Sequence, residues 1–163
     1  MLALRIFGLI VTGGGILLAQ PAGDTARGQA LFEGKGDCLS CHRVNGEGSR
    51  LGPDLSDTGA RNKADYLERA LLDPDADVAP ANRFVKVVTK DGTAITGRIL
   101  NQDNFTLQFI DAQGKLRSFM RSDLRESTLI TKSQMPPYKD KLSAQEVADL
   151  VAYMLTLKGI GKQ

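Results

Sequence analysis

The stretch Cys38-Leu39-Ser40-Cys41-His42 contains both cysteines and the one histidine of the 163-residue chain. Two thiols three positions apart can reach the two vinyl groups of one haem and form thioethers with them. The adjacent imidazole of His42 then lies under the iron as an axial ligand. Because Cys-x-x-Cys-His is the recognised pattern of covalent haem attachment, the motif predicts one haem c, bound through Cys38 and Cys41.

Three other uses of the two cysteines compete with haem. A structural disulfide suits an exported chain, because such compartments are oxidising. A thioredoxin-like redox pair requires a βαβ context, which the sequence lacks. A zinc site needs about four ligands, and two cysteines with one histidine fall short unless carboxylates complete it. Haem is the favoured interpretation, and a disulfide or redox pair is the main alternative.

The composition is that of a globular protein. Apolar residues make up 42% of the chain and charged residues 25%, while aromatic residues reach only 6% and tryptophan is absent. A porphyrin could therefore help to fill the core. The net charge of +2, without a long basic run, argues against nucleic-acid binding.

The N-terminus has the pattern of an export signal. Arg5 gives a short positive region, and residues 6–18 are almost wholly apolar. That length is typical of a signal peptide and short for a membrane span, which needs roughly 20 residues. We therefore expect residues 1–20 to be a signal peptide, with a retained anchor as the alternative, and the mature chain to be periplasmic or otherwise exported, with no membrane span.

Helical patterns lie at both ends of the expected mature chain. A short helix is predicted after Asp24, which can cap it, and a second over residues 63–72. The last helix has the clearest start, because Ser143 and Glu146 form a capping box. Gly159 is placed to end it.

Between these helices the hydrophobic pattern changes to the period of strands. Phe105, Leu107 and Phe109 alternate with polar residues, and Lys90-Asp91-Gly92-Thr93 is a hairpin turn signal. The spacing predicts four or five short strands in a meander or a small barrel. The mature chain accordingly divides into three parts: residues 21–80 with the haem motif, a β-rich insertion over residues 81–134, and residues 135–163.

A methionine is the expected sixth ligand of the iron, because the chain has no second histidine. Met154 lies on the apolar face of the last predicted helix, and Met120 closes a predicted strand, so both fit core packing. Met135 is followed by two prolines that stiffen its loop and can hold a weak thioether ligand in place. Met135 is therefore favoured over Met120 and Met154, which stay as alternatives.

Taken together, several segments resemble class I cytochromes c. The matching residues are Gly28, Phe32, the Cys-x-x-Cys-His motif, Gly52-Pro53-Asp54-Leu55, Met135-Pro136-Pro137, Leu150 and Tyr153. The resemblance implies a fold in which the first and last helices cross at a glycine and an aromatic residue. It also implies that the carbonyl of Pro53 restrains the haem-ligating His42.

The strand-rich residues 81–134 depart from the smaller members of that family, which run from the middle helix almost directly to the methionine loop. In this respect the chain looks like the haem-binding domains at the C-termini of some large bacterial dehydrogenases. The expected fold class is mainly α: a class I cytochrome c helical haem fold with an inserted small antiparallel β meander or barrel.

The resemblance implies an electron-transfer protein. Chemistry on a substrate of its own is not expected, since the chain has no second haem motif, no nucleotide fingerprint and no acid/base pair. The expected partner is a redox protein, a dehydrogenase or an oxidase. Residues 81–134 hold nine basic and five acidic side chains, a net charge of +4, which either solvates the strands and protects their edges or orients an acidic partner. The alternatives are a haem-based ligand sensor or weak peroxidase with a displaceable methionine and, third, a non-haem thiol oxidoreductase.

Overall fold

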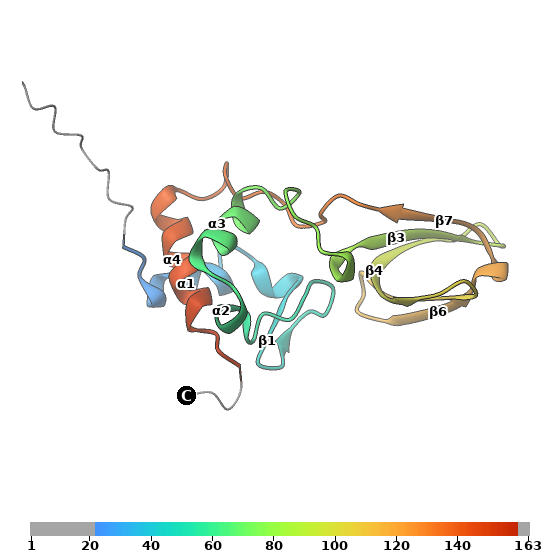
Figure 1. Cartoon of the computed structure of the whole chain (residues 1–163), viewed down its shortest axis with the longest axis horizontal. Coiled ribbons are helices and arrows are strands. Elements are labelled where there is room, and N and C mark those ends of the chain that lie inside the picture. The colour runs from blue at the N-terminus through green and yellow to red at the C-terminus, as the bar shows by residue number, and fades with distance from the viewer. Residues whose placement is uncertain (1–21, 160–163) are drawn as a thin grey trace, which may run out of the picture.

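The computed structural model describes residues 22–159, so the expected signal peptide at residues 1–20 lies outside the described part (Figure 1). Within residues 22–159, no helix is both long and apolar enough to cross a membrane. The helices are α1 (Thr25–Glu33), α2 (Thr58–Arg61), α3 (Ala64–Leu72) and α4 (Ala144–Thr156). Three short 3-10 turns accompany them, η1 (Cys38–Ser40), η2 (Pro80–Asn82) and η3 (Arg121–Asp123).

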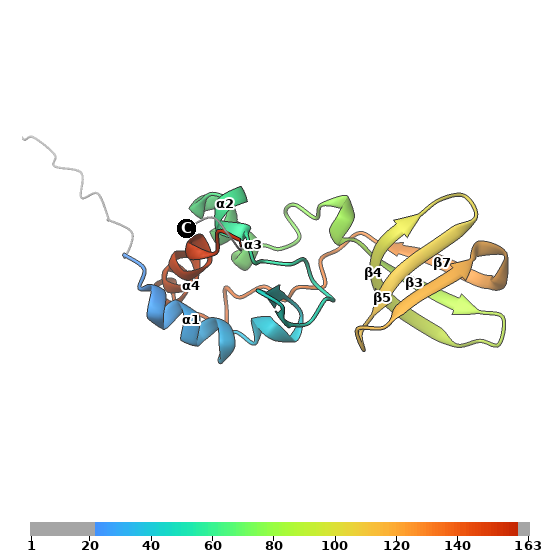
Figure 2. The same ribbon diagram turned by 90° about the horizontal axis from the view of Figure 1, so that it is seen from below.

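The expectation of a mainly α fold is wrong. Helices account for 32% of the structure and strands for 28%. The reason is that the strand-rich segment forms a complete sheet with a core of its own, at one end of the molecule beside the helices (Figures 1 and 2). The protein is therefore a mixed structure, with a helical part and a β part of similar weight.

The sheet is antiparallel, with strand order β6-β5-β4-β3-β7. Its strands are β3 (Phe84–Thr89), β4 (Ala94–Gln102), β5 (Thr106–Asp111), β6 (Leu116–Met120) and β7 (Leu124–Ile130). The sheet curls (Figure 2), but β6 and β7 are its two edges, so hydrogen bonds do not close it into a barrel in the described chain. A separate two-stranded ladder joins β1 (Arg43–Val44) and β2 (Glu47–Gly48).

The sheet and the helices have separate hydrophobic cores. Val87, Leu107 and Phe109 are fully buried on the inner face of the sheet, where the ring of Phe109 stacks on that of Phe119 with centroids 5.9 Å apart. The alternation seen in the sequence produces this face, because successive side chains of a strand point to opposite sides. Each part thus buries its own apolar surface.

In the helical part, α1 and α4 cross at Gly28. The space that a Cβ atom would need there is taken by the main chain of Asp149 and by the Cβ of Tyr153. One turn later, the rings of Phe32 and Tyr153 meet edge to face with centroids 5.4 Å apart. This glycine and aromatic contact is the crossing that the resemblance implies.

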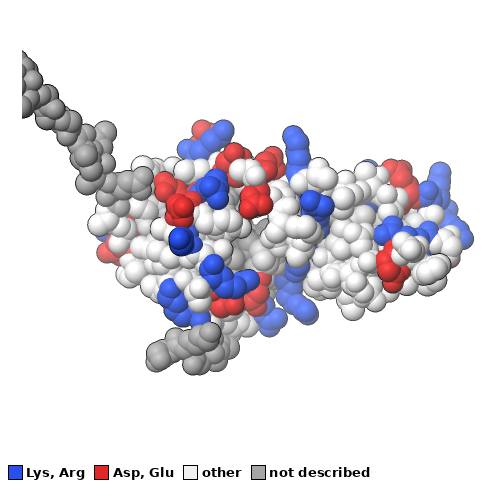
Figure 3. All heavy atoms as spheres, viewed as in Figure 1, with Lys and Arg blue, Asp and Glu red and all other residues white. Residues whose placement is uncertain are grey.

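Charged side chains of both signs alternate over the helices on the face drawn in Figure 3. On the same face, basic side chains gather at the end of the sheet that is farthest from the helices. Arg125 lies there, because its guanidinium is the neighbour of Gly92 in the turn between β3 and β4. Basic charge is therefore present at the end of the sheet that lies farthest from the helices.

Candidate functional site

Cys38 begins the 3-10 turn η1 that follows α1, and Cys41 directly follows that turn. The main-chain N–H groups of Cys41 and His42 both donate to the carbonyl of Cys38, at 3.2 and 2.8 Å. Asp37 starts this turn in the left-handed backbone region, with φ of 48°. The turn therefore fixes both thiols and the imidazole within five consecutive residues.

Both cysteines are free thiols in the structure. Cys38 is only 8% exposed within the helical core, and this burial, with Asp37 and Cys41 adding to it, raises the pKa of its thiol to about 12. A redox-active thiol needs a lowered pKa, because the thiolate is the reactive form. The site therefore gives no support to a non-haem thiol oxidoreductase.

The imidazole of His42 is held by one hydrogen bond. Its Nδ1 donates to the main-chain carbonyl of Pro53 at 2.9 Å. Because a carbonyl only accepts, Nδ1 carries the hydrogen and the lone pair of the neutral ring is on Nε2, free to bind a metal. Burial also lowers the pKa of His42, and the charge of Arg98 adds to this against the Pro53 hydrogen bond. The ring is thus kept neutral, as an iron ligand must be.

The loop that carries Pro53 lies directly on the cysteine motif. Gly52 donates its N–H to the carbonyl of Cys41 at 2.6 Å. A Cβ atom on Gly52 would stand 2.9 Å from Nδ1 and Cε1 of His42, closer than side chains approach. Gly52 is therefore needed for the ring to lie against this loop.

The methionine favoured from the sequence lies in the loop between β7 and α4. Met135 is half-buried and packs against the helical core that includes Cys38. Its N–H donates to Ser133 Oγ at 3.1 Å, and the N–H of Ser133 donates to Asp75 at 2.7 Å. The segment that follows α3 thus fixes the start of the methionine loop.

Tyr138 fixes the other end of this loop. Its N–H donates to the carbonyl of Leu71 on α3 at 2.9 Å, and its hydroxyl donates to the carbonyl of Gly36 at 2.6 Å. Gly36 is two residues before Cys38. The methionine loop and the cysteine turn are therefore joined directly through one buried side chain.

The other two candidate methionines lie elsewhere. Met154 is 6% exposed inside the helical core, and Met120 ends β6 at the edge of the sheet, where it is 48% exposed. Met135 also lines an open pocket of about 420 Å³ beside Leu72, Asp73 and Pro74.

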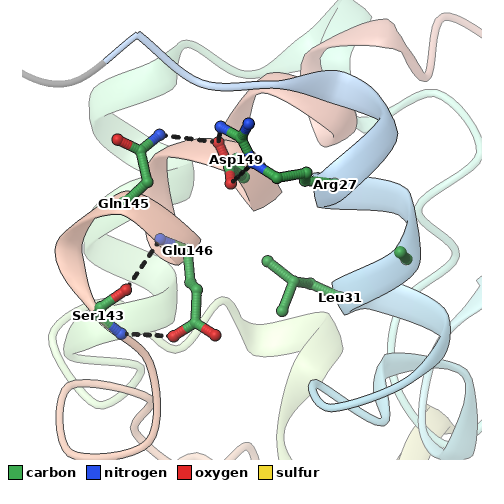
Figure 4. A pocket seen from close by; sticks show the side chains of 7 residues that line it. Arg27, Leu31, Ser143, Gln145, Glu146 and Asp149 are labelled. Atoms are coloured by element: carbon green, nitrogen blue, oxygen red, sulfur yellow. Dashed lines mark hydrogen bonds and ion pairs between the residues drawn. The ribbon is translucent and has the colours of Figure 1, made fainter.

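A larger groove, of about 590 Å³, lies between α1 and the start of α4 (Figure 4). Its polar side chains are bonded to one another: Asp149 accepts from Arg27 and Gln145, and Ser143 and Glu146 cap α4. None of the residues of the cysteine motif lines this groove. Its side chains serve the packing of two helices.

The residues present fit a covalently held haem. Among residues 22–159, the Nε atoms of Arg43 and Arg83 are buried without a hydrogen-bond partner. Arg43 directly follows His42, and a haem carries two carboxylates that a guanidinium can bind. The described residues contain no cluster of three or more His, Cys, Asp or Glu side chains that could hold a metal ion, so a zinc site at the cysteines gains no support.

Arg98 is a residue of this site that the sequence did not reveal. Arg98 on β4 donates from Nε to the carbonyl of Leu51 at 2.7 Å and from its terminal nitrogen to that of Arg50 at 2.9 Å. These carbonyls lie directly before Gly52 and Pro53. In the sequence, Arg98 has the pattern of a basic residue on a solvent-facing strand. Nothing in that local pattern indicates a contact with Leu51, which lies 47 positions away.

Comparison with known proteins identifies one family. The family model named Cytochrome c matches residues 25–107, just over half of the chain. The matched segment contains the cysteine turn and Pro53, and it ends in β5, before Met135. No curated protein matches the sequence significantly.

Proposed function

Because the chain belongs to the cytochrome c family, whose members bind haem c covalently, we propose that it carries single electrons between redox proteins with His42 and Met135 as axial ligands of its iron. The haem supplies a reversible one-electron change between ferric and ferrous iron. The observation that carries the proposal is the hydrogen bond from His42 Nδ1 to Pro53, which leaves Nε2 for a metal.

On the histidine side, each residue has a definite task in this proposal. Cys38 and Cys41 provide the thioether sulfurs, and the 3-10 turn holds them beside His42. The carbonyl of Pro53 sets the tautomer and the orientation of the ring and makes it a better electron donor. Gly52 leaves room for the ring.

On the methionine side, the support is the fixation of the loop. Ser133 and Asp75 hold its start and Tyr138 holds its end, so the thioether of Met135 can keep one position in both oxidation states. A ligand pair that does not rearrange favours fast electron transfer. Methionine and histidine ligation also raises the reduction potential relative to other axial pairs.

Our second proposal concerns the subtype of the family to which the chain belongs, and it rests on the β part. A strand insertion between the middle helix and the methionine loop is a feature of the haem-binding domains attached to large bacterial dehydrogenases. We place this chain with them, and we propose export on the pattern of residues 1–20. The role of an electron carrier without substrate chemistry of its own fits the family, whose members are usually carriers.

The partner in this proposal is a redox protein with an acidic surface, a dehydrogenase or an oxidase. The support is the net charge of +4 over residues 81–134. Lys115 and Lys132 are exposed and form no ion pair within the described chain. Lys132 directly precedes Ser133, at the start of the loop that carries the proposed ligand Met135.

The test is an absorption spectrum of the purified holoprotein, oxidised and reduced, with and without carbon monoxide. We expect a low-spin reduced form that is inert to carbon monoxide at neutral pH, because Met135 occupies the position that the gas needs. Ready binding of carbon monoxide by the wild type would replace the carrier by a sensor or weak peroxidase. The same result would follow if the iron had no axial methionine, because the position that carbon monoxide needs would then be free.

A further inference from the structure

One side chain connects the sheet to the loop that restrains the proposed iron ligand. Arg98 leaves β4 and is half-buried, with three hydrogen bonds to main-chain carbonyls: 2.7 Å to Leu51, 2.9 Å to Arg50 and 3.4 Å to Ala81. Ala81 belongs to η2, directly before the first strand of the sheet. The guanidinium therefore joins the loop before Pro53 to the sheet.

The charge of Arg98 is not neutralised within residues 22–159. All three of its acceptors are neutral carbonyls, and its guanidinium has no carboxylate within ion-pair distance there. The basic residue of β6 differs in this respect, because Arg117 pairs with the buried Asp111 at 2.7 Å. An unneutralised charge in a half-buried place acts more strongly on its surroundings than one in open water.

The field of Arg98 reaches the histidine. The carbonyls of Arg50 and Leu51, which bind its guanidinium, lie three and two residues before Pro53, whose own carbonyl accepts from His42 Nδ1 at 2.9 Å. The same field acts on any centre that His42 ligates. Ferric iron has one positive charge more than ferrous iron, so a nearby cation disfavours the ferric form.

We propose that Arg98 sets the reduction potential of the haem: its charge, held by the Arg50 and Leu51 carbonyls beside the Pro53–His42 contact, stabilises the ferrous form. This inference rests on the proposed ligation by His42. It gives the sheet a function beyond architecture, because the strand insertion supplies a charge at the loop that contacts His42. Arg98 thus positions the loop before Pro53 and acts on the iron through its charge.

The experiment is a redox titration of the holoprotein with three substitutions. Arg98→Gln removes the charge, Arg98→Lys keeps it with poorer geometry, and Arg125→Gln removes an equal charge at the far end of the sheet. We expect Arg98→Gln to shift the ferrous-to-ferric ratio about three- to tenfold toward ferric iron, an order of magnitude set by a unit charge in a partly buried site. A tenfold shift equals about 59 mV for a one-electron couple. Arg98→Lys should stay close to the wild type, and Arg125→Gln should not differ from it.

An unchanged or raised potential in Arg98→Gln, in a protein with the wild-type spectrum, would overturn the proposal and leave Arg98 as a purely structural contact. An equal shift in Arg125→Gln would do the same, because the effect would then be one of total charge. If Arg98→Gln fails to fold, Arg98→Lys decides: a potential far below the wild type would contradict a role for the charge. Failure of the ligation itself would appear earlier and separately, in the spectrum of the wild type.

Discussion

Gly28 on α1 lies directly against the main-chain carbonyl of Asp149 on α4, with no room for a Cβ atom between the two helices. This contact sets the closest approach of the first and last helices. Cys38 follows α1 by one short connection, so the position of α1 also decides where the cysteine turn lies.

Replacing Gly28→Ala should therefore destabilise the protein. Inserting a methyl group into a tight contact costs about 1–3 kcal/mol, and here the obstacle is main chain, which cannot rotate away. Urea unfolding of the holoprotein measures the loss. The control is Gln29→Ala at an exposed position of the same helix, which should change the unfolding free energy by less than about 0.5 kcal/mol. Equal stability of both variants would mean that α1 can move away from α4.

Asp149 leads to a prediction about the stability of the protein at low pH. Its carboxylate, 2% exposed, accepts from Arg27 Nε at 2.8 Å, from the N–H of Asp24 at 2.7 Å and from Gln145 at 2.9 Å. The hydrogen bond from Arg27 is the main cause that holds the pKa of Asp149 well below its usual range, against the effect of burial.

Since the folded protein lowers this pKa, the carboxylate stabilises the fold fully above its unfolded value of about 3.9 and loses that effect as the pH falls toward the folded value. We expect Asp149→Asn to be clearly less stable than the wild type at pH 7 and the difference to shrink below about pH 4. Unfolding free energies at pH 7, 5 and 3 measure it. Asp140→Asn, at an exposed position, serves as control. A difference that is constant from pH 7 to 3 would show that the charge of Asp149 does not matter.

The features that the sequence predicts well are those that depend on neighbours in the chain. Ser143 and Glu146 are three positions apart, and the capping box that they form is confirmed at the start of α4. The strand alternation of Phe105, Leu107 and Phe109 is confirmed in β5, which spans Thr106–Asp111. In both cases local hydrogen bonding or side-chain alternation decides the structure, and both can be read from a few consecutive residues.

The features that the sequence does not reveal depend on contacts between distant segments. The mainly α expectation follows from the resemblance to class I cytochromes c, and nothing in the local pattern shows that the strands around Phe109 form a core separate from the one around Leu150. Arg98 meets Leu51 only because β4 passes the loop before Pro53. A charge on a strand has the same local pattern whether it faces water or binds a carbonyl.

The proposed ligand Met135 can be tested by substitution. Met135→Ala should open the position beside the iron, so that the reduced protein binds carbon monoxide and its potential falls. Met120→Leu and Met154→Leu are matched controls, because both keep an apolar side chain and cost less than about 1.5 kcal/mol. Spectra with carbon monoxide and a redox titration give the readouts. If Met120→Leu has the large effect, the ligand assignment is wrong although the haem remains.

The last prediction concerns where a partner binds. Arg98 on β4 is paired with Ile110 on β5, and Ile110 is paired with Leu116 on β6. Lys115 directly precedes Leu116, so it lies at the end of the sheet where Arg98 binds the carbonyl of Leu51. Lys132 lies at the start of the methionine loop. These two exposed lysines are thus near the junction of sheet and helices, whereas Lys90 and Arg125 lie at the turn between β3 and β4.

If the junction attracts an acidic partner, a small anionic oxidant should react there as well. We expect the oxidation of the reduced holoprotein by hexacyanoferrate(III) to slow as salt rises, because the Debye length falls below about 8–10 Å above moderate ionic strength. Changing Lys115 and Lys132 to Gln should flatten this dependence, since the charges that steer the oxidant toward the haem are then lost. Changing Lys90 and Arg125 to Gln removes the same charge at the far end and should leave the dependence steep. A flat dependence shared by all three proteins, or equal flattening by both pairs of substitutions, would reject docking at the junction and leave these lysines the role of solvating the surface and protecting the sheet edges.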